Sequence, residues 1–161
     1  MTDPLYVSVS GSGDASPEVT ALAEEVGSRL AAANAVVVCG GLGGVMEAVC
    51  RGAKSAGGVT VGILPGTARS DANDFVDVAL PTGLGESRNA LVARAADALI
   101  AIGGEFGTLS EVALALKIGT PVVGLSTWEL HRGGEVVRAI NPAATPAEAV
   151  DLALRLARGA L

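Results

Sequence analysis

Six short apolar runs, separated by segments long enough to form helices, constrain the fold of this 161-residue chain more than any other feature. Alternating strands and helices are typical of βαβ units, which assemble into a parallel sheet. The runs do not alternate apolar with polar residues, which indicates strands that helices cover on both faces. The predicted strands cover residues 5–10, 35–39, 59–64, 76–80, 98–102 and 121–125.

Capping residues mark two of the helices. Ser16 and Pro17 are typical of an N-cap and a first helical position, and they precede a predicted helix over residues 19–33. Pro146 opens another predicted helix, which runs to about residue 158. No repeat or linker interrupts the chain, and its length suits one domain. We therefore predict a single α/β domain over residues 1–161, with a doubly wound, mostly parallel sheet and helices on both faces.

Glycine follows four of the predicted strands almost directly. These turns are residues 11–13, 40–44, 65–66 and 103–104. The carboxyl ends of parallel strands lie at one edge of the sheet, where doubly wound folds bind their ligands, so the turns predict a cleft. The alternative for the second turn is a tight connection that only packs a helix against the sheet. The candidate ligand-binding residues in the first two turns are Gly11, Ser12, Gly40, Gly41 and Gly43.

The segment from Gly103 to Glu111 is typical of a phosphate-binding turn. It leads from a predicted strand into a predicted helix, so unpaired N–H groups and the positive helix end can face an anion. An alternative is a capping box, in which Thr108 caps the helix and Glu111 returns to the Thr108 N–H. Both interpretations stay open, because a capping side chain can also line a cleft. The candidate residues here are Gly104, Glu105, Phe106, Gly107 and Thr108.

Arg88 is the most informative charged residue. If residues 84–95 form a helix, Arg88 stands at the head of an apolar face, where it either snorkels to water or enters the cleft as an anion ligand. In both cases we expect it to contribute little packing to the fold. Asn89 follows it as a further candidate ligand residue. The apolar residues on the predicted face are Leu84, Leu91, Val92 and Ala95.

Composition and missing motifs exclude several function classes. Acidic residues outnumber basic ones by 17 to 11, with one Trp, one Tyr, two Phe and no basic block, which argues against nucleic acid binding. No glycine turn fits G-x-G-x-x-G or precedes a Walker lysine, which argues against NAD and P-loop chemistry. The apolar runs are far shorter than the roughly 18 residues of a membrane span. The N-terminus lacks a signal-peptide pattern, so we predict a cytoplasmic protein.

Cysteine and histidine are too few for a metal centre. Cys39 and Cys50 are eleven residues apart, and His131 is the single histidine. This spacing fits neither a set of metal ligands nor a disulfide framework, so we predict two buried thiols and no metal site. The predicted partner is a small ligand.

Residues 103–111 resemble the P-G-G-x-G-T-x-x-E signature of the LONELY GUY (LOG), or lysine decarboxylase-like, family. Arg88 lies fifteen residues before Gly103, where that family carries the arginine paired with the glutamate of the signature. The chain is most similar to a subgroup that contains the molybdenum cofactor carrier proteins, and the resemblance covers roughly residues 5–125. The segments that carry this second resemblance are residues 38–47, 58–66, 87–89 and 107–111.

The resemblance implies a Rossmann-like domain, a homo-oligomer such as a dimer or tetramer, and a nucleotide or phosphorylated ligand in the cleft. LOG enzymes are phosphoribohydrolases that cleave the N-glycosidic bond of a nucleoside 5′-monophosphate. Carried over by position, Gly107 and Thr108 would hold the 5′-phosphate, Glu111 would face the ribose, and Arg88 would assist the departing base. In a carrier protein the same turn would hold a cofactor phosphate without turnover, and no further cofactor would be required.

Three departures from the LOG pattern favour binding over hydrolysis. Gly103 replaces the proline of the signature, Glu105 replaces its second glycine, and Asn89 replaces the basic residue after the arginine. A carboxylate at Glu105 opposes an anionic ligand unless its side chain points away. We therefore predict carrier-like binding of a nucleotide or a phosphorylated molybdopterin-type cofactor. The alternative is a LOG-type phosphoribohydrolase acting on AMP or N6-modified AMP.

Overall fold

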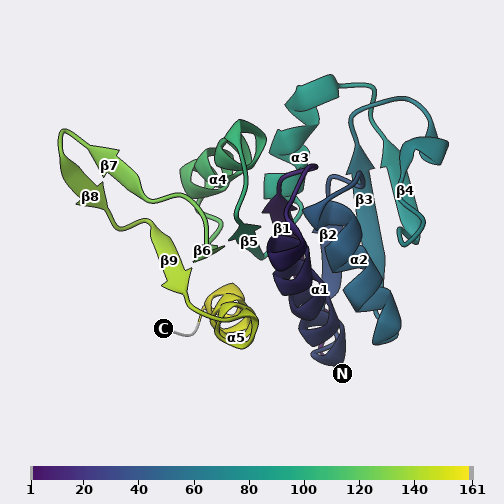
Figure 1. Ribbon diagram of the computed structural model, residues 1–161, viewed down its shortest axis with the longest axis horizontal. Coiled ribbons are helices and arrows are strands. Elements are labelled where there is room, and N and C mark those ends of the chain that lie inside the picture. The colour runs from purple at the N-terminus through teal and green to yellow at the C-terminus, as the bar shows by residue number, and fades with distance from the viewer. Residues whose placement is uncertain (1, 160–161) are drawn as a thin grey trace.

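The computed structural model describes residues 2–159 and contains a seven-stranded parallel sheet (Figure 1). Each of the six predicted apolar runs contains one strand, and the predicted and observed ends agree to within two residues. The predicted α/β class with a parallel sheet is therefore confirmed. In spatial order the strands are β4 (Val78–Pro81), β3 (Thr60–Leu64), β2 (Val36–Cys39), β1 (Tyr6–Gly11), β5 (Ala98–Ile102), β6 (Val122–Leu125) and β9 (Ile140–Ala143).

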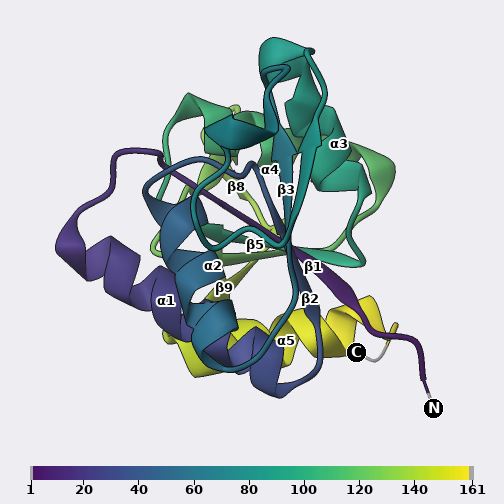
Figure 2. The ribbon, with the colours of Figure 1, turned by 90° about the vertical axis from the view of Figure 1, so that its right-hand side faces the viewer.

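Helices cover both faces of the sheet, as predicted (Figure 2). One face carries α1 (Pro17–Ala32), α2 (Val45–Ser55) and α5 (Pro146–Ala157), and the other carries α3 (Asn89–Arg94) and α4 (Phe106–Ile118). Two short 3-10 helices, η1 (Arg69–Asp71) and η2 (Gly85–Arg88), interrupt the connections.

Caps explain where two of the long helices begin. Ser16 accepts a hydrogen bond from the Val19 N–H at the start of α1, as predicted. Thr145 accepts a hydrogen bond from the Glu148 N–H at the start of α5. In each case the cap satisfies one of the four N–H groups that a helix start leaves without an intrahelical partner.

None of the helices in residues 2–159 is long and apolar enough to cross a membrane.

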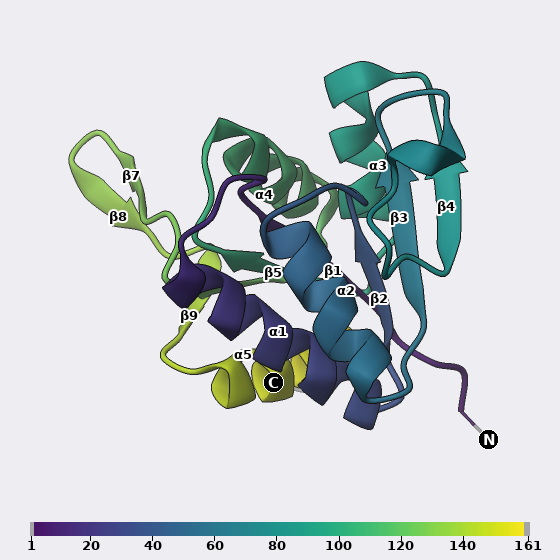
Figure 3. The same cartoon turned by 45° about the vertical axis from the view of Figure 1, so that its right-hand side comes forward.

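Three strands beyond residue 125 were not predicted. β7 (Leu130–Arg132) and β8 (Glu135–Val137) form an antiparallel hairpin that projects from one end of the molecule (Figures 1 and 3). Both glycines of its turn, Gly133 and Gly134, have positive φ, at 61° and 84°. The hairpin is mostly exposed, so it carries no apolar run that would mark it in the sequence. β9 contains Pro142, which a strand tolerates at the edge of a sheet.

The strand order creates a crevice beside β1. From β1 the chain builds outward through β2, β3 and β4, then crosses to β5 on the other side of β1 and continues outward through β6 and β9. The connections after β1 and β5 therefore run in opposite directions from neighbouring strands. Such a switch point leaves an opening at the carboxyl edge of a doubly wound sheet, where ligands bind.

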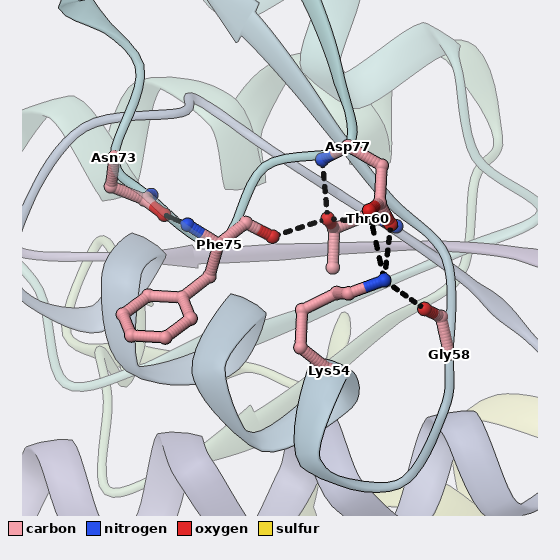
Figure 4. A network of polar contacts seen from close by, with 6 residues as sticks. All are labelled: Lys54, Gly58, Thr60, Asn73, Phe75 and Asp77. Carbon is pink, nitrogen blue, oxygen red and sulfur yellow. Dashed lines mark hydrogen bonds and ion pairs between the residues drawn. The ribbon is translucent and has the colours of Figure 1, made fainter.

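A polar network holds the β3–β4 connection against α2 (Figure 4). The Thr60 hydroxyl donates to the Phe75 carbonyl at 2.6 Å and accepts the Asp77 N–H at 2.9 Å. The Asp77 carboxylate pairs with the Lys54 ammonium of α2, with an N to O distance of 2.8 Å. Within the same connection, the Asn73 side chain donates to the Leu42 carbonyl at 2.8 Å. This last bond fixes the glycine turn between β2 and α2.

Candidate functional site

A cleft of about 400 Å³ lies at the carboxyl edge of the sheet, between the turns after β1 and β2 and the start of α4. This volume lies within the range of roughly 300–1,000 Å³ that is common for small-molecule sites. Nine of the candidate residues chosen from the sequence line this cleft, and they belong to four separate strand-to-helix connections. They are Gly11, Ser12, Gly40, Arg88, Asn89, Glu105, Gly107, Thr108 and Glu111.

Four other selected residues lie off the wall of the cleft. Gly41 has φ 78° and donates its N–H to the Cys39 sulfur, so it fixes the conformation of the turn without lining the cleft. Gly43 packs near the Gly13 carbonyl. Gly104 borders a shallow hollow next to β6, and its φ of 102° favours glycine. Phe106 points outward and is 75% exposed.

Both cysteines are buried free thiols, as predicted, and their sulfur atoms are 3.5 Å apart. Cys39 ends β2 immediately before Gly40, which lines the cleft. The pair therefore belongs to the wall behind the glycine turn.

The start of α4 shows that the predicted capping box is wrong. The helix begins at Phe106, two residues before Thr108, and its N-cap residue Glu105 makes no side-chain capping bond. Gly103 and Gly104, with φ 54° and 102°, let the chain turn into the helix early. Thr108 is consequently inside the helix and buried. The N–H groups of the first turn have no intrahelical acceptor and no side-chain cap, and two residues of that turn, Gly107 and Thr108, line the cleft.

Arg88 enters the cleft and does not snorkel to water. Its side chain is 9% exposed, and its Nε donates to the Ile63 carbonyl at 2.9 Å. Its Nη2 is 3.5 Å from the Gly40 carbonyl, and its Nη1 donates to the Asn89 amide oxygen. These bonds join β3, the glycine turn and α3, so the expectation that Arg88 contributes little packing is wrong.

The predicted apolar face around Arg88 is also wrong. Residues 84–95 do not form one helix, because η2 ends at Arg88 and α3 begins at Asn89. A 3-10 helix has about three residues per turn, so it rotates Leu84 away from the face that the following α-helix buries. Leu84 and Leu91 are exposed, while Val92 and Ala93 are buried.

We expect Arg88→Ala to lower the free energy of unfolding by about 2 kcal/mol, because the substitution leaves buried carbonyls at Ile63 and Gly40 without their donor. Urea denaturation followed by circular dichroism measures this loss. Arg94→Ala is a matched control, because Arg94 is an exposed arginine at the end of α3, the helix that follows Arg88 directly. Equal stability of the two variants would contradict a structural role for Arg88.

Glu111 shares the cleft with Arg88 and is 7% exposed. Burial raises the pKa of the Glu111 carboxyl to about 7, and the nearby positive charge of Arg88 acts in the opposite direction. Near neutral pH this carboxyl is therefore divided between a neutral form, which donates a hydrogen bond, and a charged form, which only accepts. A group of this kind can act either as a ligand contact or as an acid.

Ser10 is the clearest cleft residue that sequence reasoning missed. It is 2% exposed, lines the cleft, and its hydroxyl has no hydrogen-bond partner within residues 2–159. Ser8, two residues earlier, has a partner, because its hydroxyl donates to the Val92 carbonyl. Two serines at alternate positions of a buried strand were the signal that could have identified the polar side of β1.

Buried polar residues gather at this cleft. Of the seven buried polar or charged residues in the described part of the chain, five line it. Buried polar groups are normally satisfied by partners, so their concentration around an opening indicates a polar ligand. The five are Ser10, Arg88, Asn89, Thr108 and Glu111.

Comparison with known proteins agrees with this geometry. The SLOG cluster4 family matches residues 4–150. An uncharacterized protein of Archaeoglobus fulgidus is 41% identical over 147 residues, which are 91% of this chain and 93% of that protein.

Two solved structures are similar over nearly their whole length. The molybdenum cofactor binding protein of the phototrophic bacterium Rippkaea orientalis is 34% identical, with a TM-score of 0.85 over 94% of this chain and 96% of that one. The molybdenum cofactor carrier protein of Chlamydomonas reinhardtii is 33% identical, with a TM-score of 0.85 over 98% of this chain and 99% of that one.

Proposed function

The chain belongs to the SLOG cluster4 family, and on that premise we propose that it is a carrier-like protein whose cleft binds a phosphorylated molybdopterin-type cofactor or a nucleotide. The observation that carries this proposal is the open N-terminus of α4 beside Arg88. First-turn N–H groups, the positive end of the helix dipole and a guanidinium all favour a phosphate at the same place.

The remaining cleft residues suit the rest of such a ligand. The Ser10 hydroxyl offers a buried donor and acceptor that no described residue uses. Glu111 offers a donor in its neutral form, and Met46 and Leu42 add apolar surface. The part of the ligand next to its phosphate can use this mixture of polar and apolar contacts. The two solved relatives named for the molybdenum cofactor support the same class of ligand.

Cofactor capture tests the carrier function directly. The protein is incubated without oxygen with molybdenum cofactor released from a molybdoenzyme, then separated by gel filtration, and molybdenum is measured in the protein fraction by mass spectrometry. We expect retained molybdenum that excess AMP displaces if both ligands use the cleft. The absence of retained molybdenum together with no binding of AMP would refute the proposal.

Hydrolysis of a nucleoside monophosphate is the second candidate, because Arg88 and Glu111 line one cleft, as a LOG-type mechanism requires. Incubation with AMP and with N6-substituted AMP, followed by chromatography, would reveal free base. Release of base that Glu111→Ala abolishes would establish hydrolysis. Unchanged substrate would leave binding as the function.

A further inference from the structure

Phe106 is an exposed aromatic residue at the start of α4. It is the most exposed large hydrophobic residue in the described part of the chain, at 75%, and Leu84 follows at 52%. It is also the first residue of α4, between Glu105 and Gly107, which both line the cleft. A large aromatic ring therefore stands at the rim of the proposed phosphate site.

The Phe106 ring is held in place by Trp128. The two ring centroids are 5.8 Å apart and the planes are inclined by 34°. Aromatic pairs at this separation attract each other beyond the area they bury. These two residues are also half of the four aromatic residues in the chain, and Trp128 is its single tryptophan. The ring is thus supported at the rim by a specific contact.

A second hollow of about 550 Å³ opens beside Phe106, between α3 and α4. We call it the outer hollow. Its apolar part comes from Phe106, Ala90 and Leu114. Three of its lining residues, Glu86, Asn89 and Gly107, also line the cleft, so the two spaces adjoin at these residues. A ligand with its phosphate at Gly107 can therefore extend into the outer hollow.

The negative charge of Glu86, where the cleft and the outer hollow meet, indicates what kind of ring would fit. Glu86 lines both spaces, and its carboxylate makes no ion pair within residues 2–159. A carboxylate only accepts hydrogen bonds, so it suits the edge of a ring that carries N–H groups. Guanine and pterin place a ring N–H next to an amino group, and two parallel bonds to one carboxylate can form. Adenine places an acceptor nitrogen there instead, which a carboxylate repels.

We propose that the outer hollow is the subsite for the planar heterocycle of the ligand, stacked on Phe106, with Glu86 accepting hydrogen bonds from an N–H and amino edge. This inference rests on the proposed function, because the phosphate at α4 places the ring. It selects guanine-like and pterin-like rings over adenine.

The test compares three probes that share a phosphate: ribose 5-phosphate, AMP and GMP. Binding to the full chain is measured by calorimetry and by the fluorescence of Trp128. For the wild type we expect GMP to bind more tightly than AMP. Phe106→Ala should lower the affinity for GMP and AMP by about tenfold, which is the usual effect of losing one stacking contact. Its affinity for ribose 5-phosphate should stay unchanged. Glu86→Gln should weaken the binding of GMP about tenfold, and it should not weaken the binding of AMP, because the neutral amide no longer repels the acceptor nitrogen of adenine.

Leu84→Ala is the control, because it removes an exposed apolar side chain from the preceding connection without touching the outer hollow. Equal weakening of all three probes by Phe106→Ala would overturn the subsite and leave phosphate binding intact. Unchanged affinities of Phe106→Ala for all three probes would overturn the subsite too. If light scattering also showed a smaller molar mass for this variant than for the wild type, Phe106 would belong to an interface between copies of the chain. Failure of every probe to bind the wild type would remove the proposed function as well.

Discussion

Gly107→Asp is expected to lower affinity for a phosphorylated ligand at least about 100-fold while the protein stays folded. Gly107 is the second residue of α4 and lines the cleft. A Cβ added there has no heavy atom within 4 Å, so a side chain does not disturb the packing. The aspartate carboxylate would occupy the space in front of the first-turn N–H groups and repel the phosphate. The same charge favours the helix N-terminus, so the melting temperature should hold or rise.

Calorimetry with AMP and with inorganic phosphate measures the loss, and a thermal melt checks the fold. Gly107→Ala is the matched control, because it adds the Cβ without the charge and should retain most of the affinity. Equal affinity of the aspartate variant and the wild type would place the phosphate elsewhere. Equal loss in both variants would show that space, and not charge, limits binding at this position.

The fold could be predicted largely from the sequence, because buried parallel strands carry their signal in continuous apolar runs. All six strands from β1 to β6 overlap such runs, and Ser16 correctly marked the start of α1. Burial on both faces was wrong for β4, which lies at the sheet edge with Val78 and Leu80 exposed. The β7–β8 hairpin and β9 could not be predicted in this way. Their residues are mostly exposed or half-buried, and Pro142 in β9 argues against a strand until its place at the sheet edge is known.

The sequence predicted which turns form the site, but it did not predict the side-chain contacts within them. Glycine after consecutive strands predicted the cleft edge, because the carboxyl ends of parallel strands meet there. The capping box failed because two left-handed glycines moved the helix start ahead of Thr108. The packing of Arg88 was missed because a 3-10 turn changed the register of the predicted helical face. Such changes of register depend on the tertiary setting of each turn.

Glu111→Gln is expected to stabilise the ligand-free protein by about 3 kcal/mol at pH 8 and to leave it nearly unchanged at pH 4. Burial raises the pKa of Glu111 from an ordinary value of 4.5 to about 7. Below pH 4.5 both the folded and the unfolded chain keep the proton, so the carboxyl costs no stability. Between pH 4.5 and 7 the unfolded chain releases the proton first, and the free energy of unfolding falls as pH rises. Above pH 7 both states are ionised and the loss is complete.

Glutamine carries no ionisable group, so the variant should escape this loss while filling the same space. Urea denaturation of both proteins from pH 4 to pH 8 measures the difference in their free energies of unfolding. This difference should grow between pH 4.5 and 7. Glu25→Gln provides the control, because Glu25 is a half-exposed residue on α1, paired with Arg29. Parallel stability curves for Glu111→Gln and the wild type would mean that the native carboxyl ionises as readily as the unfolded one. A separation that opens as expected would show that the cleft holds a neutral carboxyl beside Arg88 below pH 7, ready to donate a hydrogen bond to a ligand.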